Sequence, residues 1–534
     1  MAHRLARERF DVLVIGGGIT GAGIARDAAL RGLRTALVEA GDFGSGTSSR
    51  SSRLVHGGLR YLEHGHLRLV FESSRERRIL LGIAPHLVRP LRFVWPVYRG
   101  SRVSLLRLLA GLTLYDALAL FRNVGRHRRL EPAELMAMEP ELRCEGLRGG
   151  ALYYDACTDD SRLTLANVID AVAAGCCALN YARVDALLAY GKRAGGASVS
   201  DLLSGNTLEV RSRTIVNATG PWSDRIRRLE AAVVGSGVSG TKGAHVALPR
   251  SRVGNVGALA LLHPRDGRVF FVLPAGHLTL VTTTETPGPP SPDIVRASES
   301  DVAYLLQGAN HYFPHAELER TDILSAWAGL RPLAASLVRG STGAASREHH
   351  LEFGPLGVLH VTGGKLTTFR SMAAEVVDAI VGQLGNLGQL PSSTATRPLP
   401  GGELPYDDTV AAARAAIADT TVAEHLAGAY GTRWRDVADL AARDNALAER
   451  LVEGLPYLAA ECVYAVTDEF AVTLGDILIR RTHVAFETPD HGTSVAPRVA
   501  DLVGSLFGWS ERQRHLALES YAAEVAAMFE VEPD

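Results

Sequence analysis

The stretch FDVLVIGGGITGAGIARDAALRGLRTALVE, residues 10–39, predicts a β-strand, a glycine-rich turn, a helix and a second strand that ends on an acid. Gly16, Gly18 and Gly21 have the G-x-G-x-x-G spacing. In that pattern the first glycine permits the tight turn, the second lets backbone approach a pyrophosphate, and the third lets the helix pack on the strand. Glu39 stands where a carboxylate can accept hydrogen bonds from an adenosine ribose. The unit predicts dinucleotide binding, but by itself it does not choose between FAD and NAD.

The length and composition of the chain indicate a cytosolic protein of several domains and do not indicate a nucleic-acid-binding one. A chain of 534 residues is long for one hydrophobic core, so two or three domains are expected. The 56 basic and 58 acidic side chains leave a net charge of −2, which gives no general attraction to nucleic acid. The cysteines form no C-x-x-C pair and have no zinc-like histidine spacing, so we expect reduced thiols, no metal site and a cytosolic compartment. They are Cys144, Cys157, Cys176, Cys177 and Cys462, and we expect the vicinal pair to pack within a helix.

No segment of the sequence predicts a signal peptide or a membrane-spanning helix. The first residues, MAHRLARERF, are charged and run directly into the first strand. The longest apolar stretch, Ser104 to Phe121, is interrupted by Arg107 and Asp116 and is shorter than the ~20 residues that span a bilayer. We therefore expect the catalytic part of the protein to stay in the cytoplasm.

A second glycine- and hydroxyl-rich stretch, GDFGSGTSSRSSRLVHGGLRYLE at 41–63, suits a loop that winds around a further part of a cofactor. Within it, GTSSRSSRLVHGGLRYLEHG together with the opening unit resembles the FAD-dependent glycerol-3-phosphate dehydrogenases. The resemblance continues, in order, at TIVNATGPWSD (214–224), TKGAHVALP (241–249), AGLRPL (328–333), SREHH (346–350) and VTGGKLTTFR (361–370). It implies FAD rather than NAD as the cofactor.

The resemblance implies an α/β fold with a Rossmann-like FAD-binding domain of the glutathione-reductase and D-amino-acid-oxidase type, a β-sheet substrate cap and an α-helical C-terminal domain. The predicted oxidoreductase region is 10–383, followed by a proline- and glycine-rich linker at 384–405 and the helical domain at 406–534. Within that region, the FAD-binding segments are expected at about 10–90, 150–240 and 350–383, and the cap at about 91–149 and 241–349.

Several local patterns predict individual elements. A helix begins near Asp160, which is a candidate N-cap, and β-rich segments between 184 and 210 predict a meander that leads into the Ala-Thr-Gly strand. Residues 268–284 read as a hairpin of a second sheet. The apolar stripe along Glu461–Ile479 predicts one helix, and Ser510 is a candidate cap for the last helix.

The implied reaction is oxidation of sn-glycerol 3-phosphate at its secondary alcohol, with hydride passing from C2 to the flavin and dihydroxyacetone phosphate leaving. A dianionic phosphate needs fixed cations, and we expect Arg331 and Arg347 to bind it because guanidinium offers a planar fork to phosphate oxygens. Arg60 and Tyr61 are the next candidates for substrate contact. The alternative for each arginine is a surface or domain-bridging role.

The alcohol also needs a base, and the reduced flavin needs a compensating charge. We favour His56 as the base, with His245 as its rival, and either imidazole could instead only donate or accept a hydrogen bond. Lys365, after Gly363 and Gly364, is expected to face the flavin, where Thr367 and Thr368 add hydrogen bonds. The expected FAD contacts are Gly16, Gly18, Gly21, Glu39, Thr47, Ser48, Ser49, Ala218, Thr219, Gly220, Gly363, Gly364, Lys365 and Thr367.

One residue departs from the commoner family pattern. Phe369 stands where tyrosine is expected in the K-x-T-T-Y-R run, which puts in doubt any role of that ring beyond packing.

Residues 88–130 differ in charge from the rest of the chain. They contain nine arginines and one acid, Asp116, for a local charge of +8. Interleaved apolar residues suit a segment lying on anionic lipid, and the alternative is a solvated basic face over ordinary core. The arginines are Arg89, Arg92, Arg99, Arg102, Arg107, Arg122, Arg126, Arg128 and Arg129, and the apolar residues are Phe93, Trp95, Leu105, Leu106, Leu108, Leu109 and Leu112.

The resemblance favours a protein peripheral on the inner face of the cell membrane that passes electrons to a membrane quinone. Other flavin oxidases stay open at this point, either a glycerophosphate oxidase that uses oxygen or an amine oxidase similar to D-amino-acid oxidase. A flavin-binding regulator without turnover is a further alternative. The sequence is compatible with a homodimer but does not set the oligomeric state.

Overall fold

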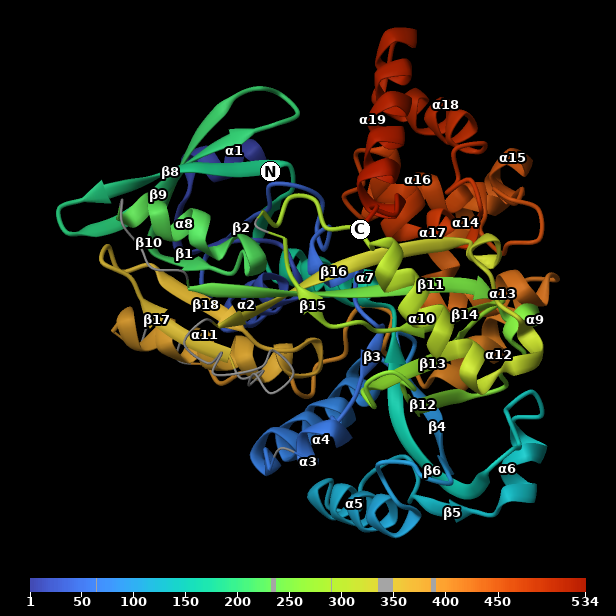
Figure 1. Ribbon diagram of the computed structural model, residues 1–534. Helices are drawn as coiled ribbons and strands as arrows, with labels where there is room; N and C mark the ends of the chain where they lie inside the picture. The colour runs from blue at the N-terminus through green and yellow to red at the C-terminus, as the bar shows by residue number, and fades with distance from the viewer. Residues whose placement is uncertain (64, 232–236, 290, 335–348, 386–389) are drawn as a thin grey trace.

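The computed structural model describes residues 1–63, 65–231, 237–289, 291–334, 349–385 and 390–534. Two β-sheets and a C-terminal group of helices make up the molecule (Figure 1). This arrangement confirms the predicted α/β fold with a sheet-built cap and a helical C-terminal domain.

The first sheet is the nucleotide-binding sheet. Its strand order is β17-β18-β10-β1-β2-β7, with β9 on β10 and β8 on β9. The pairs β10–β18, β1–β10, β1–β2 and β2–β7 are parallel. Its strands are β1 (Arg9–Ile15), β2 (Thr35–Val38), β7 (Cys177–Leu179), β8 (Ala182–Tyr190), β9 (Arg193–Asp201), β10 (Thr207–Asn217), β17 (His349–Phe353) and β18 (Leu359–Gly363).

Helices cover both faces of this sheet, which explains why its central strand β1 is buried from Phe10 to Ile15. Buried side chains of α2, α7 and α11 pack on one face, and those of α1 and α8, with the β8–β9 hairpin, pack on the other. The helices are α1 (Ala2–Arg7), α2 (Ile19–Leu30), α7 (Asp160–Ala173), α8 (Ser223–Glu230) and α11 (Phe369–Gln383).

The second sheet forms the cap. Its strand order is β15-β11-β14-β13-β12-β4-β6-β3, with β16 paired to β11 and β5 to β6. The strands are β3 (Leu54–Val55), β4 (Val88–Tyr98), β5 (Arg128–Leu130), β6 (Leu147–Thr158), β11 (Val238–Pro249), β12 (Ala258–Leu262), β13 (Val269–Ala275), β14 (Leu278–Thr282), β15 (Thr286–Pro287) and β16 (Ser325–Ala334). The helices around it are α3 (Leu59–Glu63), α4 (Leu67–Ile83), α5 (Leu105–Leu118), α6 (Pro132–Met138), α9 (Arg250–Val253) and α10 (Glu299–Tyr312).

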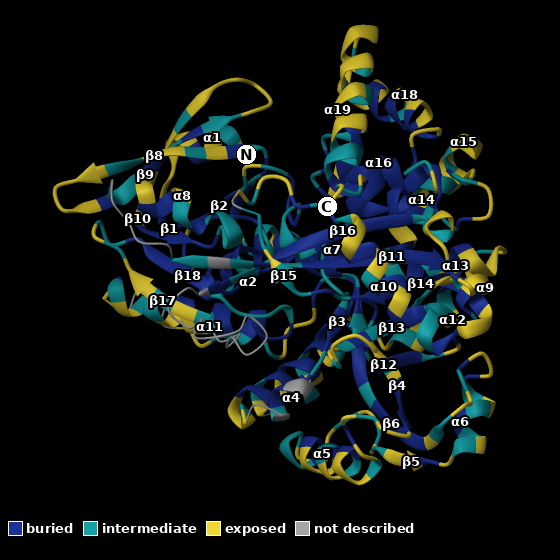
Figure 2. Cartoon of the chain, in the orientation of Figure 1, coloured by how far each residue is buried: buried dark blue, intermediate teal, exposed yellow. Residues whose placement is uncertain are grey.

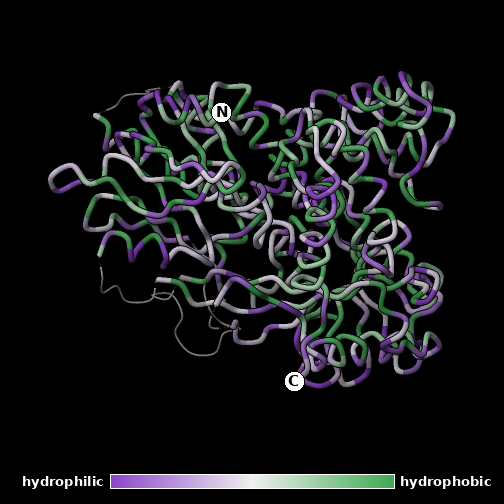
Figure 3. The backbone as a smooth tube through the Cα atoms, turned by 90° about the horizontal axis from the view of Figure 1, so that it is seen from above, coloured by the Kyte–Doolittle hydropathy of each residue, from purple (hydrophilic) through white to green (hydrophobic). Residues whose placement is uncertain are grey.

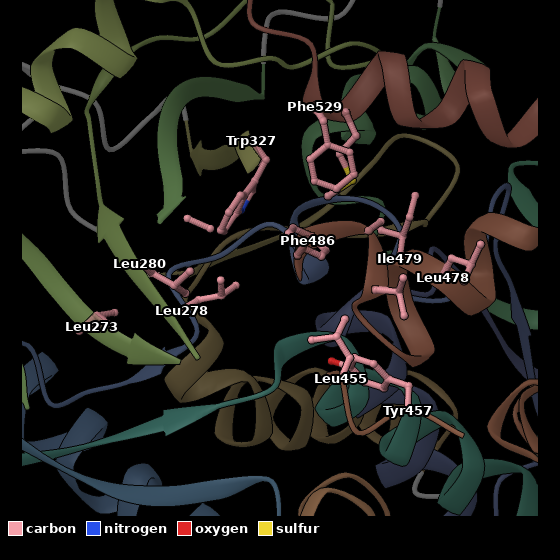
Figure 4. Close-up of a cluster of buried hydrophobic side chains, with 14 of the residues drawn as sticks. Leu273, Leu278, Leu280, Trp327, Leu455, Tyr457, Leu478, Ile479, Phe486 and Phe529 are labelled. Carbon is pink, nitrogen blue, oxygen red and sulfur yellow. The ribbon is translucent and has the colours of Figure 1, made fainter. Parts of the chain in front are cut away.

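The C-terminal helices pack directly on the cap sheet. Side chains of both regions share one buried cluster, in which Trp327 of β16 meets Phe486 with ring centroids 4.9 Å apart (Figure 4). The helices are α12 (Tyr406–Ala416), α13 (Thr420–Tyr430), α14 (Trp434–Arg443), α15 (Asn445–Ala448), α16 (Ala459–Asp468), α17 (Val484–Glu487), α18 (Ala496–Phe507) and α19 (Glu511–Phe529), with a π-helical turn at Asp476–Arg481.

Along the described residues, hydrophobic and hydrophilic stretches are interspersed (Figure 3). Among the described residues, no helix combines the length and the apolar character needed to cross a bilayer.

Three local predictions agree with the structure. Strands β8, β9 and β10 form the antiparallel meander, and β13 and β14 form the hairpin of the second sheet. Ser510 caps α19 through a reciprocal capping box with Gln513.

Other local predictions were wrong because tertiary contacts decide the geometry. Asp159, not Asp160, caps α7, and Asp160 instead accepts a hydrogen bond from the Ser51 amide (3.0 Å). The expected single helix over 461–479 ends at Asp468, and Phe470 takes a φ of +62° where its ring packs edge-on against Phe43.

The location of the cysteine pair and the start of one nucleotide-binding segment also differ from the expectation. Cys176 lies between α7 and β7 and Cys177 begins β7, so neither is within a helix, although both are buried and free. Residues up to Thr158 lie in β6 of the cap sheet, so the nucleotide-binding segment expected from about 150 begins after that strand.

The glycine turn after β1 is held by close backbone contacts. A Cβ atom on Gly16, whose φ is +105°, would lie 2.7 Å from the carbonyl oxygen of Ala218. A Cβ atom on Gly21 would lie 1.8 Å from the carbonyl oxygen of Gly16. The first turn of α2 therefore fits beneath β1 only because these positions carry no side chain.

We expect Gly21→Ala to destabilise the protein and to abolish retention of flavin, because the added methyl group displaces the Gly16 carbonyl and with it the turn. The loss is about 1–3 kcal/mol or more, as for overpacked cores. Thermal unfolding and the visible flavin spectrum of the purified protein measure both effects.

Gly82→Ala is the matched control, since Gly82 lies in α4 with open space around its Cα. There alanine is expected to stabilise the helix by about 0.5–1 kcal/mol. A Gly21→Ala protein with wild-type stability and flavin content would contradict the assigned role of the turn.

Candidate active site

A cavity of about 590 Å³ lies between the nucleotide-binding sheet and the cap sheet. Its wall comes from the turn after β1, the loop between β2 and β3, the ends of β10 and β18, and the cap strands β11 and β16. This position is the usual one for a ligand in an open α/β sheet, beyond the carboxyl ends of the parallel strands.

Glu39 connects the glycine turn to the following loop. Its Oε2 accepts from the Gly17 amide (2.6 Å) and its Oε1 from the Gly41 amide (2.8 Å). Burial raises the pKa of Glu39, and these two amides oppose the rise. Because a carboxylate has further lone pairs, the same side chain can still accept from a ribose hydroxyl. Nearby, the Ser48 hydroxyl accepts from the amide of Ile19 (2.9 Å), the first residue of α2.

His56 and Lys365 meet at another part of the wall. Thr367 Oγ1 lies 3.2 Å from the amide nitrogen of His56, which ties the loop before α3 to the 3-10 turn that follows β18. The Lys365 ammonium lies 3.6 Å from the centroid of the Tyr61 ring, and the His56 ring stacks on the same tyrosine at 6.4 Å. The buried Tyr61 thus supports both side chains from behind the cavity.

His245 and Arg331 belong to neighbouring cap strands and both line the cavity. Arg331 donates to Thr283 Oγ1 (3.0 Å) and to the Thr284 carbonyl (3.4 Å). His245 is only 2% exposed, and its ring lies parallel to Trp327 with centroids 5.3 Å apart. Burial, followed by the charge of Arg331, lowers the pKa of His245 to about 3, so this imidazole is neutral at physiological pH.

The structure brings most of the predicted site residues together. Those on the cavity wall are Gly16, Gly18, Glu39, Thr47, Ser48, His56, Ala218, Thr219, Gly220, His245, Arg331, Gly363, Gly364, Lys365 and Thr367. Gly21 and Ser49 lie behind the wall. The side chain of Arg60 and the whole of Arg347 fall outside the described residues. Phe369 is fully buried, and a Cβ atom on Gly23 would lie 2.9 Å from its ring, which fits a packing role.

The sequence reasoning missed several wall residues, among them Arg50 and Ser52. The Nε of Arg50 is shielded from solvent and has no hydrogen-bond partner within the described chain. Burial lowers the pKa of Arg50 to about 10, so the guanidinium still carries its charge at neutral pH. The run TSSRSSR, which contains polar side chains within a predicted cofactor loop, was the signal that could have identified them.

A buried ion cluster joins the cofactor loop to the C-terminal domain. Asp42, three residues after Glu39, accepts from Arg480 Nε (2.6 Å) and from both terminal nitrogens of Arg481 (2.6 and 2.9 Å). Arg480 also donates to Asp476 (2.7 Å) and to Glu524 (2.6 Å). Burial alone would raise the pKa of Asp42, but Arg481 and Arg480 hold it below its ordinary value.

The basic segment 88–130 is only partly as predicted. All nine arginines are exposed, whereas Phe93, Trp95, Leu108 and Leu112 are buried in the core shared with the C-terminal helices and cannot contact lipid. The prediction for these four residues was wrong because their positions along β4 and α5 face inward. The exposed large apolar side chains lie instead at Leu106, Leu114, Leu120, Phe121 and Val124, with Leu67 and Phe71 on the adjoining α4 (Figure 2).

The features of the cavity fit a long anionic dinucleotide. The glycine turn lets a pyrophosphate approach backbone amides at the N-terminus of α2, and Glu39 stands one strand away as an acceptor. A buried Arg50 Nε without a partner within the described chain adds a cation to the wall. Among the described residues, no cluster of three or more histidine, cysteine or acidic side chains could hold a metal ion.

Comparisons with known proteins agree with these features. Residues 11–370 match the family model described as FAD dependent oxidoreductase, and residues 392–514 match the C-terminal domain of alpha-glycerophosphate oxidase. The chain is 36% identical over 530 residues to a glycerol-3-phosphate dehydrogenase of Synechocystis sp., which covers 96% of this chain and 95% of the relative. It is 38% identical over 540 residues to glycerol-3-phosphate dehydrogenase 2 of Mycobacterium tuberculosis, covering 99% of this chain and 91% of the relative.

A solved structure extends the likeness to three dimensions. The glycerol-3-phosphate dehydrogenase from Bacillus halodurans complexed with FAD superposes with a TM-score of 0.82 at 30% identity. The superposition covers 99% of this chain and 98% of the other.

We expect Asp42→Asn to weaken the whole protein, because two buried guanidinium groups lose their shared counter-charge. Breaking a buried pair in this way costs about 3–5 kcal/mol. The pKa of Asp42 is lower in the folded protein than its value of about 3.9 in an unfolded chain. Its stabilisation is therefore complete above that pH and lost as the pH falls towards the folded-state pKa, so the variant should show less acid sensitivity.

Urea unfolding as a function of pH, together with the FAD content of the purified protein, measures these effects. Glu449→Gln is the control, since Glu449 pairs with Arg498 at the surface (2.7 Å), where an ion pair contributes about 0–1 kcal/mol. Equal small effects of both substitutions would show that the buried cluster does not hold the loop.

Proposed function

The chain belongs to the FAD-dependent glycerol-3-phosphate dehydrogenases, and on this premise we propose that it oxidises sn-glycerol 3-phosphate to dihydroxyacetone phosphate and passes the electrons to a membrane quinone. The observation that supports the substrate is the grouping of Arg331, His245, His56 and Lys365 on one cavity wall. That set supplies a phosphate-binding cation, two imidazoles and an ammonium group, which are the groups the oxidation of a phosphorylated alcohol requires.

Arg331 is the cation that we propose for the substrate phosphate. Its guanidinium is anchored at Thr283 and Thr284 on one side, and a Cβ atom on Gly243 would lie 2.3 Å from its Nη2. The glycine thus leaves the fork-shaped head enough space at the cavity wall. Arg347 and Arg60 remain proposed partners of the same phosphate on the strength of the family resemblance.

The two histidines differ in how they can take part in proton transfer. His56 lies on a loop beside two glycines, next to Thr367 and Tyr61, and we propose that it contacts the substrate alcohol through a hydrogen bond. His245 is neutral because of its low pKa and lies on a rigid sheet, where it can accept a hydrogen bond from the substrate side. Bound FAD supplies the acceptor for the hydride from C2.

Lys365 provides the charge that we propose to offset the anion formed on reduction. Its ammonium rests on the Tyr61 ring and lies 3.4 Å from Ser73 Oγ, so it is held at the wall and does not extend into solvent. A positive charge already in place when the negative charge develops costs no reorganisation during the reaction.

For the electron acceptor, we propose a quinone reached from the membrane surface. The exposed apolar side chains are carried by α4, α5 and the turn after α5, and α4 and α5 are in contact (Figure 1). The same stretch of the chain, residues 88–130, carries nine exposed arginines. Exposed apolar side chains within a basic segment are typical of a peripheral attachment to anionic lipid, which we propose at the inner face of the cell membrane. We call this apolar group the membrane rim; it consists of Leu67, Phe71, Leu106, Leu114, Leu120, Phe121 and Val124.

We expect the anaerobic flavin spectrum to bleach with sn-glycerol 3-phosphate and to stay unchanged with D-amino acids. Arg331→Ala should raise the KM for glycerol 3-phosphate by about 10- to 100-fold, since a hydrogen bond between charged groups contributes about 1.5–3 kcal/mol. Steady-state kinetics with a soluble quinone analogue give KM and kcat.

The matched control is Arg252→Ala, because Arg252 is an exposed arginine of the cap that pairs with Asp322 away from the cavity. It should leave KM unchanged. A flavin that bleaches only with amines would refute the proposed substrate, and reoxidation by oxygen but not by quinone would favour the oxidase alternative.

We expect the protein to float with anionic vesicles at low salt, and less with neutral vesicles or at high salt. The double substitution Leu106→Asn and Phe121→Asn should reduce flotation, because it removes apolar side chains that are 80% and 56% exposed. Leu506→Asn, a substitution of an exposed leucine in α18 of the C-terminal domain, is the control. Wild-type protein that stays in the soluble fraction at low salt would show that the rim does not bind lipid.

A further inference from the structure

Three side chains form a row across the centre of the cap sheet. His245 of β11 pairs in register with Thr282 of β14 on one side and with Trp327 of β16 on the other. Directly opposed residues of neighbouring strands point to the same face, so the three side chains lie side by side. The parallel stack of His245 on Trp327 fixes the plane of the imidazole.

Ser52, from the loop before β3, closes this row at the cavity. Its Oγ accepts a hydrogen bond from Thr282 Oγ1 (3.0 Å) and lies 3.1 Å from Nε2 of His245. A serine hydroxyl has a single hydrogen to donate. Because Thr282 already donates to Ser52, that hydrogen is available for Nε2, which then acts as the acceptor.

The remaining nitrogen of the ring is then the protonated one. A neutral imidazole that accepts at Nε2 carries its proton on Nδ1. Nδ1 is shielded from solvent and has no hydrogen-bond partner among the residues that the structure describes. The Thr282–Ser52–His245 row, which we call the hydroxyl row, therefore leaves the basic nitrogen of His245 in contact with Ser52.

The accessible end of the hydroxyl row is Ser52. Both Ser52 and His245 line the cavity together with Arg331, but Ser52 is half-buried, whereas His245 is almost completely buried. A substrate held by Arg331 can therefore reach the Ser52 hydroxyl more readily than Nε2 itself.

We propose that Ser52 is a further catalytic residue of this reaction and relays the proton of the substrate alcohol to Nε2 of His245, with Thr282 as its positioning residue. This inference rests on the proposed function. The alcohol O–H bond breaks and a new O–H bond forms on Ser52, while the original Ser52 proton moves to Nε2. Bound FAD would accept the hydride from C2, so the products would be the ketone, a protonated His245 and reduced cofactor.

Binding of the substrate phosphate changes the charges around His245 in a way that suits this relay. The charged groups that lower the pKa of His245, after burial itself, are Arg331 of β16 and Arg53 of the loop before β3. A dianionic phosphate bound at Arg331 offsets these charges and makes protonation of Nε2 easier. His245 thus becomes a better proton acceptor when the substrate is present.

Stopped-flow reduction of the FAD-loaded enzyme by sn-glycerol 3-phosphate tests the relay. We expect Ser52→Ala to slow flavin reduction by about 100-fold or more, which is the usual rate contribution of a general acid or base. The apparent Kd of the substrate should change little. The solvent deuterium isotope effect on reduction should also fall, since one of two moving protons is removed. Thr282→Val should slow reduction by roughly 10-fold, and Thr282→Ser, which keeps the hydroxyl, should restore it.

Ser505→Ala, on the exposed surface of α18, is the control and should match wild type. The relay is wrong if the flavin of Ser52→Ala is reduced at a rate within about threefold of the wild-type rate and the solvent isotope effect is unchanged. If Ser52→Ala does not retain FAD, the two Thr282 variants test the relay in its place. Equal rates of flavin reduction in Thr282→Val and Thr282→Ser would also overturn the proposal. Wild-type enzyme that is not reduced by glycerol 3-phosphate would refute the proposed function instead, so the two failures are distinguishable.

Discussion

The carboxylate of Asp42, held between Arg480 and Arg481, is the interaction on which the arrangement of the active site depends. Asp42 begins the loop that delivers Thr47, Ser48, Arg50 and Ser52 to the cavity, and both arginines come from the π-helical turn of the C-terminal domain. All three side chains are almost completely buried, so their charges are stable there only because opposite charges lie beside them. Among the wall residues that the structure describes, none comes from the helical domain, yet this domain holds the loop that lines the cavity.

The sequence could predict the features that depend on local geometry. The Gly16–Gly18–Gly21 spacing specifies a turn that tolerates no Cβ atom, and the Ser510–Gln513 pair specifies a helix start, because both are complete within a few residues. The ordered family motifs added the residues of the cavity wall. Their roles at the wall stay predictions, since proximity alone does not assign chemistry.

The features that the sequence could not predict depend on partners far along the chain. Asp42 lies more than 400 positions from Arg480, and the apolar pattern of Phe93 and Trp95 is equally compatible with a lipid-facing and a buried surface. The end of α16 shows the same effect, because a good helical stripe is broken where Phe470 turns to pack on Phe43. Tertiary packing overrides local propensity wherever such a contact buries more surface than one more helical turn would.

The proposed membrane rim and the active site share one buried network. Tyr115, on the inner face of α5, donates to Asp155 Oδ1 (2.6 Å), and the same oxygen accepts from the Gly57 amide (3.0 Å) next to His56. A Cβ atom on Gly57 would lie 2.3 Å from the Tyr115 hydroxyl, so this loop fits closely against α5. His56 is therefore held by a loop whose position depends on α5, whereas His245 is held by three paired strands. Side chains on strands are placed more precisely than those on loops, so His245 and Thr282 keep their relative positions even if α5 shifts on a lipid surface.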